Sequence, residues 1–168
     1  MIPISGVSRP TTMDFDFKSQ YLYFSDSQSL KIERVKLFQS KPIKEDFITE
    51  GLVKVEGMAI DWVARNIYWA DEGLRAVYVA ALDKPEFRKT LVAHNATNIR
   101  SLAVEPRLAY MFWSTWSNLE AGGPPEDQGG IFASWMDGRH VKQIVGTDLT
   151  WPNGLTFDYD TRKLYWAD

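Results

Sequence analysis

Short apolar runs, separated by polar turns, recur along the whole chain, and no window repeats its apolar residues with the period of a helix. The runs are four to seven residues long and rich in Val, Ile, Tyr, Phe and Trp. Asp-Gly, Asn-Gly and Pro, which are typical of turns, interrupt them. This pattern predicts β-strands throughout, and therefore an all-β protein.

A four-residue motif organises these runs into repeats. Each copy begins with two aromatic residues, and the copies lie at 23–26, 68–71, 112–115 and 165–168. The motif residues that we expect to pack between sheets or to close a turn are Tyr23, Asp26, Tyr68, Trp69, Asp71, Phe112, Trp113, Tyr165, Trp166 and Asp168. The copies are 45, 44 and 53 positions apart, and a polar insertion at 120–129, expected to be an exposed loop, accounts for the longest interval.

A carboxylate precedes the last residue of each motif copy by ten positions and closes a short apolar run. These carboxylates are Asp16, Asp61, Glu105 and Asp158. Two of these carboxylates could be interpreted as a catalytic acid–base pair. Because a carboxylate recurs in every repeat, we expect a role in a turn instead.

The spacing predicts four short antiparallel strands per repeat of about 45 residues, which is typical of a β-propeller blade. Third strands are expected at 31–37, 76–82 and 130–136, and fourth strands at 46–49, 88–92 and 141–145. Residues 1–168 then form a partial propeller of about three and a half four-stranded blades out of an expected six, with blades at about 11–50, 55–93 and 99–146 and an incomplete one at 152–168. We expect a piece of a longer ring. The alternative is a half-ring completed by a second copy, and in both cases exposed blade edges favour self-association.

Composition narrows the function. The chain carries 19 basic and 22 acidic residues, a net charge of -3, which argues against a nucleic-acid partner. It has no cysteine, so disulfides, zinc fingers and thiol catalysis are excluded within it. The longest apolar run, residues 76–82, is far shorter than the ~20 residues of a membrane span, and the first residues lack the features of a signal peptide. No nucleophile elbow, phosphate loop or HExxH motif is present, so we expect no enzyme and no catalytic residue.

The motif combination resembles the YWTD repeats, or class B repeats, of the low-density lipoprotein receptor family. The most specific stretches are 55–62, 135–138 and 149–156, and the absence of a Gly-His pair distinguishes the chain from WD-type propellers. Some positions depart from the family pattern. Ser25, Ala70 and Ala167 replace its Thr, and Thr115 replaces its Asp.

The resemblance implies an extracellular, protein-binding propeller of a single-pass endocytic receptor, with ligand uptake at the plasma membrane and acid-dependent release in endosomes. Implied ligands are proteins of the lipoprotein, protease-inhibitor or growth-factor type. Flanking EGF-like modules are implied too. Calcium is expected only in modules of that kind, and no cofactor or metal is expected in this segment. The alternative is a signalling propeller, similar to a Wnt co-receptor, or a matrix-binding one.

The candidate ligand-binding residues are Glu56, Arg100, Trp151 and Asn153. We expect them just before the first strand of their blades. In a propeller the innermost strand lines the central channel, so these entry positions should ring one mouth of it. Their chemistry differs between blades, as expected for a contact surface, and Trp and Arg are typical of binding hot spots. In the family, positions matching Arg100, Trp151 and Asn153 belong to the ligand-contacting face of some members. An enzyme alternative is a six-bladed calcium-dependent lactonase or esterase with Glu56 and Asn153 as metal ligands, but Arg100 then places a cation where a carboxylate is needed.

Three further residues are weaker candidates. His94 and His140 are the only histidines and could sense endosomal pH, although exposed loop histidines are the simpler interpretation. Asn95 begins an Asn-Ala-Thr sequon and is a candidate glycosylation site.

Overall fold

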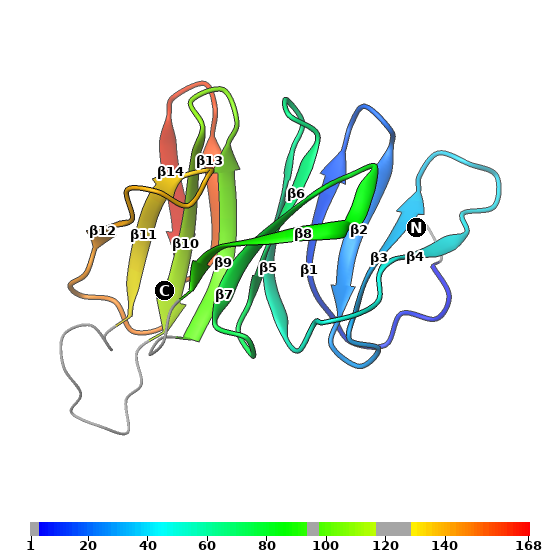
Figure 1. Ribbon diagram of the computed structural model, residues 1–168, viewed down its shortest axis with the longest axis horizontal. Helices are drawn as coiled ribbons and strands as arrows, with labels where there is room; N and C mark the ends of the chain where they lie inside the picture. The colour runs from blue at the N-terminus through cyan, green and yellow to red at the C-terminus, as the bar shows by residue number, and fades with distance from the viewer. Residues whose placement is uncertain (1–3, 94–97, 117–128) are drawn as a thin grey trace.

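The structure of the protein is a computed structural model that describes residues 4–93, 98–116 and 129–168. Within these residues the chain forms strands and turns but no helix. Four separate antiparallel sheets stand side by side (Figure 1). The predicted all-β class and its four-stranded units are confirmed.

Each sheet is a meander in which every strand pairs with its neighbour in sequence. The first sheet contains β1 (Pro10–Asp16), β2 (Tyr21–Asp26), β3 (Lys31–Lys36) and β4 (Lys44–Ile48). The second contains β5 (Val55–Asp61), β6 (Asn66–Asp71), β7 (Ala76–Ala81) and β8 (Lys84–Ala93). The third contains β9 (Asn98–Glu105), β10 (Tyr110–Trp116), β11 (Gly130–Trp135) and β12 (Lys142–Val145). The fourth is a pair, β13 (Asn153–Asp158) and β14 (Lys163–Ala167).

Strand β8 is longer than the sequence predicts, since it begins at Lys84 and the prediction began at residue 88. Its pairing with β7 jumps from Ala80↔Arg88 to Ala81↔Lys84, so residues 85–87 have no partner on β7. Pro85 has no N–H to donate to a ladder, which is a physical reason for an interruption there. Strand β8 therefore continues on both sides of a bulge at residues 85–87.

The motif aspartates close the sheets by accepting backbone hydrogen bonds. Asp71 accepts one from the N–H of Val53 and one from that of Lys54, each at 2.9 Å. Asp26 and Asp168 likewise accept from the residues 18 and 17 positions before them. Each motif thus anchors the segment that leads into the first strand of its own sheet.

The third sheet is the exception, because Thr115 stands where the other motifs have Asp. The Thr115 side chain is buried, and its hydroxyl has no hydrogen-bond partner within the described part of the chain. A threonine has a single short hydroxyl group, whereas an aspartate offers two acceptor oxygens. The backbone hydrogen bonds that Asp26, Asp71 and Asp168 accept therefore have no counterpart at Thr115 within the described residues.

The repeated carboxylates lie in turns, as expected. Asp61 Oδ1 accepts from the backbone N–H of Val63 and Ala64, at 2.9 Å each, and Asp158 binds the turn after β13 in the same way. In every repeat the residue four positions after the carboxylate has a positive φ. These residues are Gln20 (62°), Arg65 (64°), Ala109 (57°) and Arg162 (56°).

Aromatic side chains of the motif form the cores between sheets. Trp69 and Trp113 are 1% and 0% exposed, and each stacks on an aromatic ring of the next strand, Tyr78 and Phe132 respectively. Phe112 stacks on Phe157 and so joins the third sheet to the fourth. Tyr165 and Trp166 occupy the same motif positions but are 50% and 39% exposed, because β14 pairs only with β13.

Two buried carboxylates make the fold sensitive to acid. The hydrogen bond from Arg65 lowers the pKa of Asp16 to about 2, although burial opposes it. Burial alone would raise the pKa of Asp26, but four backbone N–H groups hold it at about 2. Both values lie below the ordinary 3.8, so this stabilisation is complete above about pH 4 and is lost as the pH falls towards 2.

We therefore expect the urea midpoint of unfolding to fall between pH 4 and pH 2, and the Asp26→Asn variant to show a shallower fall. The exposed residue Asp160 supplies the control, since Asp160→Asn should keep the wild-type slope. Parallel slopes in the wild-type chain and Asp26→Asn would contradict this assignment.

Candidate functional site

The four candidate residues lie where the first strands of three sheets begin. These strands, β5, β9 and β13, are neighbours in space, as is β1 (Figure 1). Glu56 and Arg100 lie near the starts of β5 and β9, Trp151 just precedes β13, and Asn153 is its first residue. The fold thereby brings positions far apart in sequence to one end of adjacent strands.

Glu56 and Arg100 belong to a charge network between the second and third sheets. Arg100 Nη1 lies 3.2 Å from Glu56 Oε1, and Arg100 Nη2 lies 3.6 Å from Glu72 Oε1. Lys54 Nζ bridges the same two carboxylates, at 3.4 Å from Glu56 and 2.7 Å from Glu72. Two cations and two anions therefore alternate, and Arg100 is only 9% exposed.

An aromatic pair covers the other side of Arg100. Its guanidinium carbon lies 3.7 Å from the ring centre of Trp116, a cation–π arrangement. The Trp116 ring in turn lies 6.3 Å from that of Trp151, which is 51% exposed. We call Lys54, Glu56, Glu72, Arg100, Trp116 and Trp151 the mouth cluster. Asn153, which lies two residues after Trp151, is exposed and is not part of this cluster.

Two buried N–H groups of the mouth cluster lack an acceptor. Arg100 Nε and Trp116 Nε1 have no hydrogen-bond partner among the described residues. Buried polar groups are usually paired, so two such donors in one cluster point to an acceptor supplied from outside the described residues. A carbonyl group of a protein ligand has this chemistry.

The sequence pattern did not single out Lys54, Glu72 or Trp116. Glu72 and Trp116 each follow the last residue of a motif copy directly, whereas the predicted site residues lie at the starts of the first strands. A comparison of this position between repeats would have shown Ser27, Glu72 and Trp116, which differ as a contact surface should. Lys54 lies two positions before Glu56 and carried no such signal.

The remaining candidates lie elsewhere. The ring of His140 contacts that of Trp135 in a tilted arrangement, with ring centres 3.9 Å apart, in the turn between β11 and β12. His94, Asn95 and most of the insertion, residues 120–128, lie outside the described residues. In the described ranges no group of three or more His, Cys, Asp or Glu side chains is arranged to hold a metal ion, and no helix is long and apolar enough to cross a membrane.

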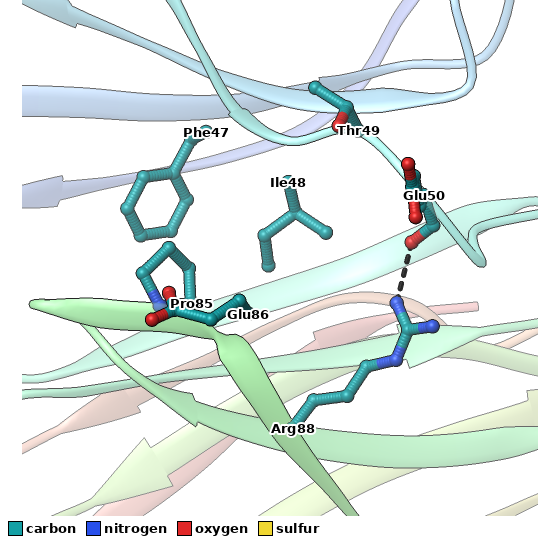
Figure 2. Close-up of a pocket in the computed structure, with 7 residues that line it drawn as sticks. All are labelled: Phe47, Ile48, Thr49, Glu50, Pro85, Glu86 and Arg88. Atoms are coloured by element: carbon teal, nitrogen blue, oxygen red, sulfur yellow. Dashed lines mark hydrogen bonds between the residues drawn. The ribbon is translucent and has the colours of Figure 1, made fainter.

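A separate groove of about 390 Å³ lies between β4 and β8 (Figure 2). Phe47, Ile48 and Pro85 form its apolar part. Arg88 reaches across it, and its Nη1 donates to the backbone oxygen of Glu50 at 2.5 Å. Because Arg88 already binds the main chain of Glu50, we read this groove as part of the contact between the first and second sheets.

Receptors are among the curated proteins that the chain resembles. It is 28% identical to the vitellogenin receptor of Solenopsis invicta over 151 residues and 30% identical to the vitellogenin receptor Yl of Drosophila melanogaster over 152 residues. These alignments cover 88% and 90% of the chain but only 8% and 7% of the relatives. The human low-density lipoprotein receptor-related protein 5-like protein is 29% identical over 148 residues, which is 88% of the chain and 54% of the relative.

Solved structures show the same architecture. A chain in the crystal structure of the nidogen/laminin complex matches with a TM-score of 0.83 and 29% identity, over 95% of this chain and 56% of that one. A gluconolactonase from Xanthomonas campestris matches with a TM-score of 0.72 at 16% identity, over 96% of this chain and 54% of that one, and shares the fold alone. No family model matches the chain. The chain thus spans about half, or much less, of the proteins it resembles.

Proposed function

Because the chain is a YWTD-repeat propeller domain of the low-density lipoprotein receptor family, we propose that it binds protein ligands through the mouth cluster and Asn153. The unpaired N–H groups of Arg100 and Trp116, beside the half-exposed ring of Trp151, carry this proposal. An aromatic anchor with neighbouring buried donors is the usual composition of a hot spot. A ligand backbone carbonyl or side-chain amide fits the unpaired donors, since Glu56 and Glu72 already balance the charges of Arg100 and Lys54.

The parent protein that we propose is a single-pass endocytic receptor. Its propeller faces the extracellular side of the plasma membrane and the endosome, next to EGF-like modules, and its ligands are of the lipoprotein, protease-inhibitor or growth-factor type. Two relatives named vitellogenin receptors support this choice. Acid-dependent release is part of the proposal, with His94 and His140 as the candidate sensors.

A matrix-binding role is the second candidate, and the match to a chain of the nidogen/laminin complex favours it. We further propose that the domain performs no chemistry. In the lactonase alternative Glu56 would be a calcium ligand. Here Glu56 Oε1 faces two cations, Arg100 and Lys54, and their positive charges oppose a divalent ion at that oxygen.

The test measures binding of purified vitellogenin and purified laminin to the immobilised chain by surface plasmon resonance. We expect Trp151→Ala and Arg100→Met to weaken binding of the recognised ligand about 10-fold or more, as hot-spot truncations do. Trp62→Ala is the control, because Trp62 is a similarly exposed tryptophan at the opposite end of β5.

Equal losses in all three variants, or wild-type affinity in Trp151→Ala and Arg100→Met, would contradict the assignment of the mouth cluster. Failure of both ligands to bind the wild-type chain would contradict the proposed ligand classes. Dissociation at pH 5.5 as slow as at pH 7.4 would contradict acid-dependent release.

A further inference from the structure

A second hollow of about 490 Å³ lies at the other end of the sheets, between the second and third. Apolar side chains form much of its lining, among them Leu108 and Trp135. Asp61, Tyr68 and Ala109 also line it. Asp61 ends β5, whereas Glu56 lies near its start, so this hollow is about 17 Å along the strand from the mouth cluster.

Asp61 is a buried carboxylate that faces this hollow without a cation. It is 3% exposed, and both of its hydrogen bonds, from two backbone N–H groups, go to Oδ1. In the described part of the chain no Lys, Arg or His forms a salt bridge with it. The equivalent carboxylates of the neighbouring repeats are also buried, but Asp16 pairs with Arg65 and Glu105 pairs with Arg107.

The boundary between the first and second sheets shows which partner the corresponding carboxylate takes. Arg65 lies four residues after Asp61, at a φ of 64°, and points back to Asp16 of the preceding sheet. Its Nη1 donates to Asp16 Oδ1 at 2.7 Å, and its Nη2 contacts Oδ2. This is a two-pronged guanidinium–carboxylate pair across the sheet boundary.

One repeat later the same position carries an alanine. Ala109 lies four residues after Glu105 and has a similar φ of 57°, so it corresponds to Arg65, and Asp61 corresponds to Asp16. Ala109 is too short to reach Asp61 with a charged group. A corresponding hollow of about 410 Å³ lies between the first and second sheets, and Arg65 lines it. The hollow between the second and third sheets differs in that Ala109 replaces the arginine and the buried carboxylate of Asp61 has no ion pair within the described residues.

We propose that this hollow binds an arginine side chain of a protein partner. The guanidinium pairs with Asp61, and its aliphatic stem packs on Leu108 and Trp135. The local charge suits a cation, because Arg139 at the rim is paired with Asp137, and the electrostatic attraction of Asp61 to Arg65 involves a guanidinium that is already paired with Asp16. Arginine fits better than lysine, since its planar fork matches a carboxylate and is more weakly hydrated.

The experiment titrates the full chain with N-acetyl-arginine methylamide and follows the indole N–H signal of Trp135 by NMR, assigned with a Trp135→Phe sample. We expect a saturable shift. N-acetyl-citrulline methylamide, the neutral isostere, should give none, and the lysine analogue should bind at least several-fold more weakly. Free L-arginine, which adds a charged amino and carboxylate group, should bind no more tightly than the blocked form.

Two variants and one control locate the site. Asp61→Asn keeps an acceptor oxygen for the turn but removes the charge, and Ala109→Arg supplies the internal guanidinium, so both should abolish the shift. Gln20→Arg is the matched control, because Gln20 occupies the same left-handed position in the first repeat and lies outside this hollow. It should bind as the wild type does.

Several results would overturn the proposal. One is a shift with the citrulline compound equal to the shift with the arginine compound. Another is undiminished binding of the arginine compound in Asp61→Asn or Ala109→Arg. A third is free arginine that binds 10-fold more tightly than the blocked form, which would make the ligand a free amino acid. Thermal unfolding of each variant shows whether it is folded. Loss of ligand binding at the mouth cluster leaves this result unaffected, because the two sites lie at opposite ends of β5.

Discussion

Replacing Trp113 by alanine is expected to lower the free energy of unfolding by about 3–5 kcal/mol, the usual cost of removing a large aromatic side chain from a core. The Trp113 side chain is 0% exposed and stacks on Phe132 with ring centres 5.7 Å apart. Its loss leaves a cavity in the core between the second and third sheets, where Trp113 packs with Tyr68 and Val77. Urea unfolding followed by circular dichroism measures the loss.

Trp166 provides the matched control, since it occupies the same motif position in the fourth repeat. It is 39% exposed, so Trp166→Ala should cost much less, about 1 kcal/mol or below. Similar losses for the two variants would mean that Trp166 is buried in solution by a further strand or a second copy of the chain. The pair of variants therefore separates the role of the motif from the role of its surroundings.

The second large effect is expected from Gly57→Ala. A Cβ atom on Gly57 would lie 2.4 Å from the backbone oxygen of Arg100 and 2.6 Å from the backbone nitrogen of Leu102. Both atoms belong to β9, which cannot yield as a flexible side chain would. We expect a loss of about 3 kcal/mol, at the upper end for overpacking, together with weaker ligand binding, because β9 carries Arg100.

Gly154→Ala is the control for this substitution. Gly154 lies four positions before Asp158, as Gly57 lies four before Asp61, but a Cβ there would meet no atom within 4 Å. Its φ of 54° should cost about 1 kcal/mol. A Gly57→Ala variant that unfolds at the same urea concentration as the wild type would show that β5 and β9 are not packed this closely.

Much of the fold could be predicted from the sequence because each repeat encodes it independently. Every strand pairs with the strand before or after it, so the apolar runs and the turn carboxylates are sufficient to define the meander. The exception is β8, whose bulge depends on how Pro85 meets the ladder. A periodic pattern does not record such an interruption.

The candidate site was only partly predictable. Glu56, Arg100 and Trp151 were predicted because they vary where packing positions repeat, and the structure places them in one cluster. Trp116 and Glu72 join them from the ends of other strands, and this depends on the angle between sheets. The hollow at Asp61 was missed for a similar reason. The Arg65 side chain crosses to the preceding sheet, so an arginine and the carboxylate it pairs with belong to different repeats, and this relation appears only in three dimensions.

The separation of the sheets has a mechanical consequence. No backbone ladder joins one sheet to the next among the described strands, so side chains and isolated hydrogen bonds carry all of the load between them. Tension applied at the two ends of the chain would act on these weaker contacts before it acts on a ladder. The chain should extend in steps of one blade, each releasing about 45 residues, or about 160 Å of contour length. A propeller built in this way can yield to tension one blade at a time.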